Sequence, residues 1–574
     1  MSARSVETQL TVHKSEVAVG GAAVAAMQPL AARVGADVLR DGGNAVDAAI
    51  ATAFALSVVE PFMSGPLGHG GMLVALPDGA ITAIDFVTRA PHALAVDDLR
   101  QARQGAAAVN PAGLPPFRGP KSVSVPSAVF GLLEAHHRFG TLELDRLLAP
   151  SIRLASDGFE PNWYYSLVTA ASMEVLLASP EARDEFLVGG RRPPAPRLRA
   201  EGPFDRVRHA ALAATYQELT SSGPDSFRAG PLAERISDSL REAGSYVGEQ
   251  DLRAYQPSVN RGMRVPFRGY DVIVAGDTSG GPTLAQALRM LDRFDPGEFA
   301  PKCADYYHLL AEVQRSAFLD RFAYLGDPDA TGIAPDVWAS DAVAAVGASA
   351  LDLKGATPDR SANPYSFAPA PRLGAPGSDA GSGGGDCTTH TCVVDRERMT
   401  VSLTVTYGRP FGSGVMVPDT GLLTANILEQ FALDPAAANA ARPWCRPVWN
   451  GAPVVVERAG HPIMALGAPG SKRIPTALLQ VLWLVLGHGL GIQRAIETPR
   501  VHCEGDTTVI DDRVDGAVIE ELGRRGHRLS VVHESFNSVN FARPNGILID
   551  SATGMLTAGA DEFRMGHCVG VEFE

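Results

Sequence analysis

The spacing of hydrophobic positions changes about two thirds of the way along the chain. Before residue 374, apolar side chains mostly recur at helical spacing, as over 29–39, 45–59 and 306–324. After residue 387, short stretches rich in Val, Thr and Leu alternate with turns, beginning with 388–395 and 399–406, which is typical of strands. The pattern predicts a helix-rich N-terminal part and a strand-rich C-terminal part, and it favours two sheets covered by helices.

The clearest single elements lie in the first hundred residues. The segment 45–59 is apolar on nearly every side, which predicts a buried helix, and Asn44 is placed to cap it. The glycine-rich segment 64–71 (SGPLGHGG) precedes a hairpin predicted over 72–86. A phosphate-binding loop would instead follow a strand and open a helix with a lysine. We therefore expect 64–71 to allow a close approach of the backbone to the core or to an active site.

The change of pattern is marked by a run of small residues. Residues 335–373 lose their periodicity, and 374–385 (GAPGSDAGSGGG) lead to Cys387 and Thr388, where the first strand of the C-terminal part begins. If the Cys387–Thr388 peptide bond were cut, Thr388 would carry a hydroxyl nucleophile and a free α-amine that can act as its base. The simpler alternative is a flexible linker followed by an ordinary strand threonine. Further along, a helix is expected at about 424–431.

Composition and charge narrow the class of protein. With 574 residues and 45% hydrophobic side chains the chain can bury a large core. Its net charge of −14, without a basic cluster, argues against nucleic acid or an anionic membrane as a partner. No secretory signal and no apolar run long enough to span a bilayer is evident, so we expect a cytoplasmic enzyme. The six cysteines are scattered, which favours neither a disulfide framework nor a metal site.

The order and spacing of many short motifs resemble the γ-glutamyltranspeptidase family of N-terminal nucleophile hydrolases over nearly the whole chain. No single motif is specific by itself. The motifs are DGGNAVDAA (41–49), SGPLGHGG (64–71), SVSVPS (122–127), LLAPSI (147–152), TSGGPT (278–283), AFLDRFAYLGDPD (317–329), TTHTCVVD (388–395), FGSG (411–414), GAPGSKR (467–473), ETPRVH (497–502) and GAD (559–561).

This resemblance implies a fold and a maturation step. The fold is of the α+β class, a four-layer αββα sandwich of the N-terminal nucleophile hydrolase type. The chain would be made as a precursor that cleaves itself before Thr388. The products would be a large subunit, 1–387, and a small subunit, 388–574, that remain together as one folded unit. The family needs no metal or organic cofactor.

The resemblance also assigns catalytic roles. Thr388 would attack an acyl group and form an acyl-enzyme that water or an amine resolves, and Thr406 would hydrogen-bond to the nucleophile and orient it. Gly470 and Ser471 fall on the family's Gly-Gly pair, whose backbone N–H groups form the oxyanion hole. Serine still donates its N–H, and this turn opens a predicted helix, where unpaired donors are expected.

The residues that hold the glutamyl group in this family are changed here. The family clamps the substrate's α-carboxylate with an arginine after Asp-Phe. In this chain Val87 stands at that position and Arg89 follows two residues later. Residues i and i+2 of a strand face the same way, so Arg89 can reach the pocket, although a surface arginine at a strand end is an equal alternative.

Five further positions of the expected pocket also differ. Gly408 replaces an asparagine, Ile427 and Gln430 replace the glutamine and aspartate that hold the α-amine, and Trp449 and Asn450 replace a Ser-Ser pair that binds the carboxylate. Each lost charge-assisted hydrogen bond is worth roughly 1.5–3 kcal/mol. We therefore expect the nucleophile chemistry to be kept and the specificity to be changed.

Three hypotheses follow. The first is a self-processing hydrolase of a small non-glutathione acyl substrate, resembling side branches such as cephalosporin acylases, oxamate-type amidohydrolases and homologues in pathways to alkylproline antibiotics. In the last group the homologue is thought to cleave a C–C bond. The second is an ordinary γ-glutamyl hydrolase or transpeptidase in which Arg89 does the clamping. The third is an unprocessed, inactive binding protein.

Overall fold

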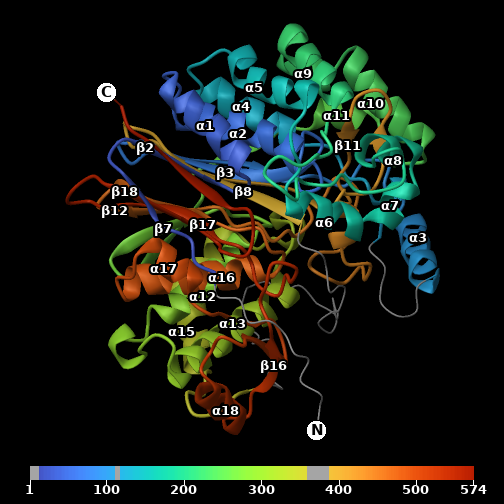
Figure 1. Cartoon of the computed structure of the whole chain (residues 1–574). Helices are drawn as coiled ribbons and strands as arrows, with labels where there is room; N and C mark the ends of the chain where they lie inside the picture. The colour runs from blue at the N-terminus through green and yellow to red at the C-terminus, as the bar shows by residue number, and fades with distance from the viewer. Residues whose placement is uncertain (1–11, 110–116, 358–386, 574) are drawn as a thin grey trace.

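The computed structural model describes residues 12–109, 117–357 and 387–573 (Figure 1). The run of small residues at 374–385 lies outside this range. The described part has the predicted mixed character, with most helices before residue 357 and most strands after residue 387. Two seven-stranded sheets form its centre.

The first sheet carries the strand that begins at Cys387. Every pair of neighbouring strands in this sheet is antiparallel. In spatial order its strands are β19 (His567–Val571), β2 (Ala22–Ala26), β8 (Cys387–Val394), β9 (Thr400–Gly408), β3 (His69–Ala75), β4 (Ile81–Phe86) and β5 (Ser258–Asn260).

The second sheet is also antiparallel. In spatial order its strands are β1 (Val17–Val19), β18 (Leu556–Ala560), β17 (Asn545–Ile549), β13 (His461–Gly467), β12 (Val454–Arg458), β7 (Tyr270–Val274) and β6 (Met263–Phe267). Each sheet therefore combines strands from both sides of the junction between residues 387 and 388. Neither seven-stranded sheet is therefore formed by one part of the chain alone.

Apolar side chains join the two sheets face to face. Leu73, Ala75 and Ala83 of the first sheet pack against Ile273 and Val455 of the second. Residues 69, 71, 73 and 75 of β3 alternate onto this inner face, because successive side chains of a strand point to opposite sides. These four residues of β3 therefore face the second sheet.

Helices cover the outer faces (Figure 1). The helices on the side of the first sheet are α1 (Pro29–Arg40), α2 (Ala45–Val59), α4 (Ala128–Phe139), α5 (Leu144–Asp157) and α9 (Ala210–Ser222). Those on the side of the second sheet are α12 (Gly281–Leu291), α13 (Ala304–Tyr324), α16 (Arg473–Leu482) and α17 (Ile492–Glu497).

The remaining elements lie at the periphery or in connections. They are α3 (Val96–Val109), α6 (Trp163–Ala171), α7 (Met173–Leu177), α8 (Pro180–Phe186), α10 (Pro231–Glu242), α11 (Glu249–Ala254), α14 (Pro328–Thr331), α15 (Asp341–Ser349), α18 (Gly516–Arg524), the pair β10 (Met416–Val417) and β11 (Leu422–Leu423), and a small sheet of β14 (Val501–Cys503), β15 (Thr507–Asp511) and β16 (Arg528–Val532).

Among the predictions for single elements, one is confirmed and two are wrong in whole or in part. Asn44 does cap α2, with a reciprocal hydrogen bond from its own N–H to Asp47, and every residue of α2 is buried. The expectation of irregular structure after residue 335 was wrong in part, because α15 forms there and buries Val343 against its neighbours. The helix expected at about 424–431 is only a short 3₁₀ turn, Ile427–Gln430.

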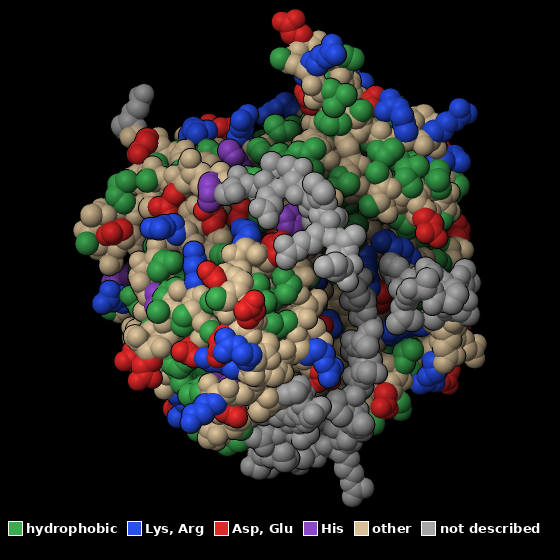
Figure 2. Space-filling view, turned by 60° about the horizontal axis from the view of Figure 1, so that its bottom comes forward, with side chains coloured by type: hydrophobic (Ala, Val, Ile, Leu, Met, Phe, Trp, Pro, Cys, Tyr) green, Lys and Arg blue, Asp and Glu red, His purple; other side chains and the backbone are tan. Residues whose placement is uncertain are grey.

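One face of the molecule shows acidic and basic side chains interspersed, without a large patch of one sign among the described residues (Figure 2). Within the described ranges, no helix has the length and apolar character needed to cross a membrane.

Candidate active site

The peptide bond between Cys387 and Thr388 lies at the start of β8, and both side chains are buried. The Thr388 hydroxyl oxygen is 2.6 Å from the Cys387 carbonyl oxygen and 3.2 Å from the Thr406 hydroxyl oxygen. The Thr406 hydroxyl also donates a short hydrogen bond to the Cys387 carbonyl and accepts one from the Gly408 N–H at 2.9 Å. The structure thus brings the predicted nucleophile and its predicted orienting residue onto one carbonyl group.

Cross-strand register shows which other side chains share this face. Thr406 lies opposite His69, and two residues back along β9 Thr404 lies opposite Gly71. Gly71 in turn lies opposite Asp85 of β4. Directly opposed residues present their side chains to the same side of a sheet, with Cβ atoms about 5 Å apart. His69 and Asp85 therefore point into the same inner space as Thr406.

Two buried histidines on this face have opposite surroundings. His390 is hydrogen-bonded to the Thr404 hydroxyl at 2.8 Å and lies 3.3 Å from the Cys392 sulfur. Neither ring nitrogen of His69 has a hydrogen-bond partner among the described residues. Burial lowers the pKa of each imidazole to about 3, so both rings are neutral at pH 7. The His69 ring lies edge-to-face against Trp449, with 5.3 Å between ring centroids.

Three of the predicted pocket residues meet at the end of β9. Gly408 has a φ of +91°, which favours glycine. A Cβ atom there would lie 2.6 Å from the Ile427 side chain and 3.7 Å from the Gln430 amide nitrogen. The glycine therefore allows the turn that carries Ile427 and Gln430 to close against the strand that carries Thr406.

The other predicted pocket residues lie on or beside the segment 444–450. Arg89 donates to the Trp444 carbonyl at 2.8 Å, and its guanidinium lies over the Trp444 ring. Arg321 donates to the Trp449 carbonyl at 3.0 Å and to the Asn450 side-chain oxygen at 2.7 Å. Asn450 is thus held by an arginine, and Arg89 is directed toward Trp444.

An ion-pair network also holds the segment 444–450 in place. Arg446 contacts the buried carboxylate of Asp327 at 2.7 Å and that of Asp277 at 2.7 Å. These charges raise the pKa of Arg446 and lower that of Asp327. Burial, with the neighbouring Asp277 carboxylate, raises the pKa of Asp85 to about 7. The segment that carries Trp449 is therefore tied firmly to the second helix layer.

The predicted oxyanion turn opens α16. Gly470 has a φ of +147° and Ser471 one of +53°. Their carbonyl oxygens accept the first N–H groups of the helix, at 3.1 and 3.0 Å. Neither backbone N–H of the pair has an acceptor among the described residues. Just before the turn, a Cβ atom on Gly467 would collide with the ring of His390, so the turn begins close to the start of β8.

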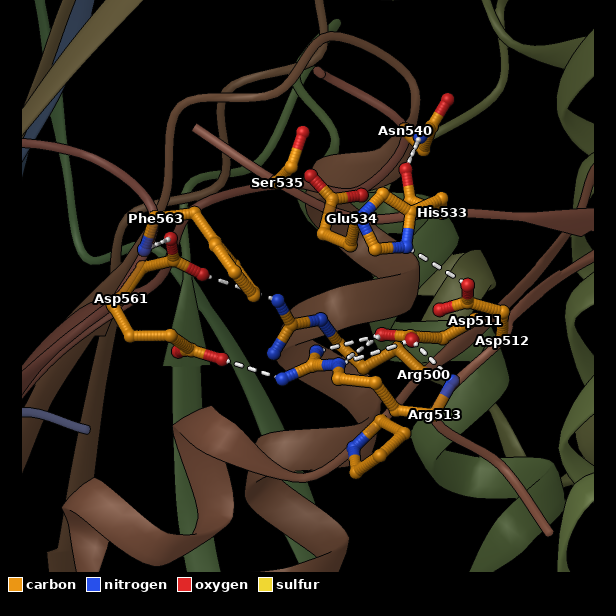
Figure 3. Close-up of polar contacts among 12 residues, drawn as sticks. Arg500, Asp511, Asp512, Arg513, His533, Glu534, Ser535, Asn540, Asp561 and Phe563 are labelled. Carbon is orange, nitrogen blue, oxygen red and sulfur yellow. Dashed lines mark hydrogen bonds and ion pairs between the residues drawn. The ribbon is translucent and has the colours of Figure 1, made fainter. Parts of the chain in front are cut away.

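A loop from the C-terminal part holds this turn in place. The Arg543 N–H donates to the Pro469 carbonyl at 2.9 Å, and a Cβ atom on Gly470 would lie 2.3 Å from that of Ala542. The Ala542 carbonyl accepts from Arg500 at 3.2 Å. Arg500 also pairs with the buried Asp561 at 3.2 Å, within a wider network of charged side chains (Figure 3). This charged network supports the donor turn indirectly.

The arrangement of the described side chains also shows whether they could hold a metal ion or form a disulfide bond. No group of three or more His, Cys, Asp or Glu side chains in the described ranges is arranged to hold a metal ion. None of the six cysteines, all of which lie in the described ranges, forms a disulfide bond. Cys387 and Cys392 are buried, as expected for small filler side chains.

Comparisons with known proteins place the chain in the class of N-terminal nucleophile hydrolases, which are enzymes. Residues 31–571 match the family described as Gamma-glutamyltranspeptidase, and the chain belongs to that family. The glutathione hydrolase proenzyme of Bacillus subtilis (strain 168) is 31% identical over 568 residues, covering 96% of this chain and 92% of that protein.

Solved structures extend the comparison to other branches. The cephalosporin acylase from Bacillus halodurans is 26% identical, with a TM-score of 0.86, and the match covers 100% of both chains. The structure of LmbA2991HD is 26% identical, with a TM-score of 0.82, covering 98% of this chain and 100% of that chain. The predicted family is confirmed, and so is the resemblance to members outside the glutathione hydrolases.

Sequence reasoning missed His69 and Asp85 as residues of this site. His69 was visible in the segment 64–71, but that segment was assigned only a close backbone approach. In the sequence, the Asp-Phe pair that contains Asp85 served only to locate Arg89. A histidine inside a glycine-rich stretch at the start of a strand was the available signal. Its importance depends on the strand register with Thr406, which the sequence does not state.

Proposed function

We propose that the chain is a self-cleaving hydrolase of the four-layer αββα type that uses Thr388 to transfer the acyl group of a small, non-glutathione substrate. Cleavage divides the chain into a large subunit, 1–387, and a small subunit, 388–574. The observation that carries this proposal is the convergence of the Thr388 and Thr406 hydroxyls on the Cys387 carbonyl.

Self-cleavage follows from that contact. The Thr388 hydroxyl oxygen attacks the Cys387 carbonyl carbon, and the Thr406 hydroxyl stabilises the developing oxyanion. The C–N bond then breaks, the proton of the hydroxyl passes to the departing nitrogen, and an ester links Cys387 to the Thr388 oxygen. Water hydrolyses the ester, which releases the Cys387 carboxylate and leaves Thr388 with a free hydroxyl and α-amine.

The same residue then acts on the substrate. The free α-amine of Thr388 takes the proton of its own hydroxyl, and the oxygen attacks the substrate's acyl carbon. The N–H groups of Gly470 and Ser471, which have no acceptor among the described residues, are the donors assigned to the oxyanion. The leaving group departs with the proton, and water or an amine resolves the acyl-enzyme.

The surroundings of the site argue against a γ-glutamyl substrate. Arg89 donates to the Trp444 carbonyl and its guanidinium lies over the Trp444 ring, so part of its binding capacity is already used. Ile427 is fully buried and cannot bind an ammonium group. Trp449 fills space where the family has two serines. The bond cleaved is an amide or a C–C bond, and we favour a secondary-metabolite pathway, such as one to an alkylproline antibiotic, in the cytoplasm.

The resemblance to a glutathione hydrolase proenzyme supports the second candidate, an ordinary γ-glutamyl hydrolase or transpeptidase. An assay with glutathione and a γ-glutamyl anilide separates the two. We expect turnover far below the range typical of enzymes, roughly 1–10³ per second. Turnover within that range would refute the non-glutathione substrate and restore Arg89 as the clamp.

Denaturing gel electrophoresis of the purified chain tests self-cleavage. The 60.4 kDa chain should give bands of about 40 and 20 kDa, with the smaller band beginning at Thr388. Thr388→Ala should remain one chain and be inactive, whereas Thr388→Ser, which keeps a hydroxyl, should still cleave. A wild-type chain that stays whole on long incubation would instead support an unprocessed binding protein.

A further inference from the structure

Trp449 and three buried side chains linked to it by nearby contacts carry polar atoms without hydrogen-bond partners in the described part of the chain. They are both ring nitrogens of His69, the Trp449 Nε1, the Thr278 hydroxyl and one carboxyl oxygen of Asp85, none of which has a hydrogen-bond partner among the described residues. Each of these side chains is nine-tenths or more buried. Most buried polar groups in proteins are hydrogen-bonded, so a cluster of exceptions calls for a ligand or for ordered water.

The contacts of Trp449 join these groups into one subsite. Its ring lies edge-to-face against His69. Its backbone N–H donates to the Thr278 carbonyl at 2.9 Å. A Cβ atom on Gly71 would lie 3.5 Å from the indole, and Gly71 is opposite Asp85 in the sheet. The indole therefore packs over Gly71, on the same inner face as Asp85.

The subsite is next to the proposed nucleophile. His69 is directly opposite Thr406, whose hydroxyl oxygen is 3.2 Å from that of Thr388. Adjacent strands are about 4.8 Å apart, so His69 is two strand spacings from Thr388. A short acyl group attached to the Thr388 oxygen would extend over Thr406 and end beside His69 and Trp449.

The chemistry of the unpartnered atoms indicates what this end of the substrate carries. The indole and one imidazole nitrogen donate, the other imidazole nitrogen accepts, and the Thr278 hydroxyl does both. The four side chains of the subsite include no cation, because burial lowers the pKa of His69 to about 3 and so keeps its imidazole neutral. The subsite itself therefore offers a carboxylate no positive charge, whereas a hydroxyl group can both donate to it and accept from it.

We propose that His69 and Trp449 form an acyl-side subsite that selects a short hydroxyacyl group for transfer to Thr388. This inference rests on the proposed function, because it requires Thr388 to be the acyl acceptor. The two residues bind the substrate's hydroxyl oxygen and proton, and they take no part in breaking the bond.

Paired p-nitroanilide substrates test the selection directly on the processed wild-type protein. Lactoyl is compared with isobutyryl, and 3-hydroxybutyryl with isovaleryl, because each pair differs by a hydroxyl in place of a methyl group. Release of p-nitroaniline gives kcat/KM, and intact mass reports the acyl group on Thr388. We expect the better hydroxyacyl compound to exceed its methyl partner roughly 10- to 100-fold, since a methyl group leaves the buried donors unsatisfied.

Variants then assign the preference to residues. His69→Phe keeps a ring but removes both nitrogens, and Trp449→Phe removes the indole N–H. Each should bring the ratio of the two kcat/KM values close to one while Thr388 is still released as a new N-terminus. Trp483→Phe is the matched control, because that indole is also fully buried with an unpartnered Nε1 but lies among the helices that cover the second sheet, so the ratio should not change.

Each outcome has a distinct meaning. Equal kcat/KM values within both pairs would show that the subsite holds only water and would overturn the inference. Preference for a γ-glutamyl or succinyl anilide, each of which carries a carboxylate, would also overturn it. A chain that does not cleave, or that acylates with no compound, would instead refute the proposed function.

Discussion

Replacing Thr406 with valine tests the role of a single hydroxyl in self-cleavage. Valine has nearly the same shape and suits a strand, so β9 should remain intact. The variant loses the short hydrogen bond to the Cys387 carbonyl and leaves the Gly408 N–H, 2.9 Å away in the wild type, without its acceptor. Loss of these contacts should lower the free energy of unfolding by about 1–3 kcal/mol.

The effect on cleavage should be larger than the effect on stability. The Thr406 hydroxyl is aimed at the oxygen on which negative charge develops, and removal of one such donor typically slows a reaction by about 10²–10³. The appearance of the small subunit is followed on a denaturing gel after purification of the intact precursor. Urea unfolding is measured in the Thr388→Ala background, where the chain stays whole.

Thr404→Val is the matched control. Thr404 lies two residues earlier on the same face of β9 and is hydrogen-bonded to His390 at 2.8 Å, away from the Cys387 carbonyl. It should lose a similar amount of stability and still cleave within a few-fold of the wild-type rate. Cleavage of Thr406→Val at the wild-type rate, or equal slowing in both variants, would refute the assignment of Thr406.

Three further predictions concern other parts of the molecule. Gly470→Ala would place a Cβ atom 2.3 Å from that of Ala542 and so displace the donor turn, and we expect the rate of acyl transfer to fall by on the order of 10²-fold. Gly489→Ala is the control, because there is open space around Gly489, and it should keep the wild-type rate. The folded protein retains the Asp85 proton between the ordinary pKa of 3.8 and about 7, so the free energy of unfolding of the wild type falls as pH rises through this range. In urea titrations Asp85→Asn should therefore gain stability relative to the wild type from pH 5 to pH 8, and a pH-independent difference would contradict this. The Lys14 ammonium donates to three backbone carbonyls near the C-terminus, so Lys14→Met should lower the urea midpoint by an amount equivalent to roughly 1.5–3 kcal/mol, and an unchanged midpoint would show that water replaces the contact.

The mixed helix and sheet character was predictable because it depends on local patterns. The apolar surface of 45–59 and the cap at Asn44 specify α2 without help from the rest of the chain. The stretches at 388–395 and 399–406 pair as neighbouring strands, joined by a short turn. In contrast, α15 was missed, because its few buried residues find their partners on other helices.

The sequence by itself determined contiguous motifs, and these motifs predict the chemistry. Thr388 follows the junction, and Gly470 and Ser471 open a helix, so their types and positions already indicate a nucleophile and a donor turn. Only the tertiary structure decided how the two parts of the chain interleave in both sheets, since strand order is set by contacts between residues far apart in sequence. It also decided the surroundings of Thr388. His69 and Trp449 are 380 residues apart in the sequence. Strand register places His69 beside Thr406, and packing between the sheets places Trp449 against the His69 ring.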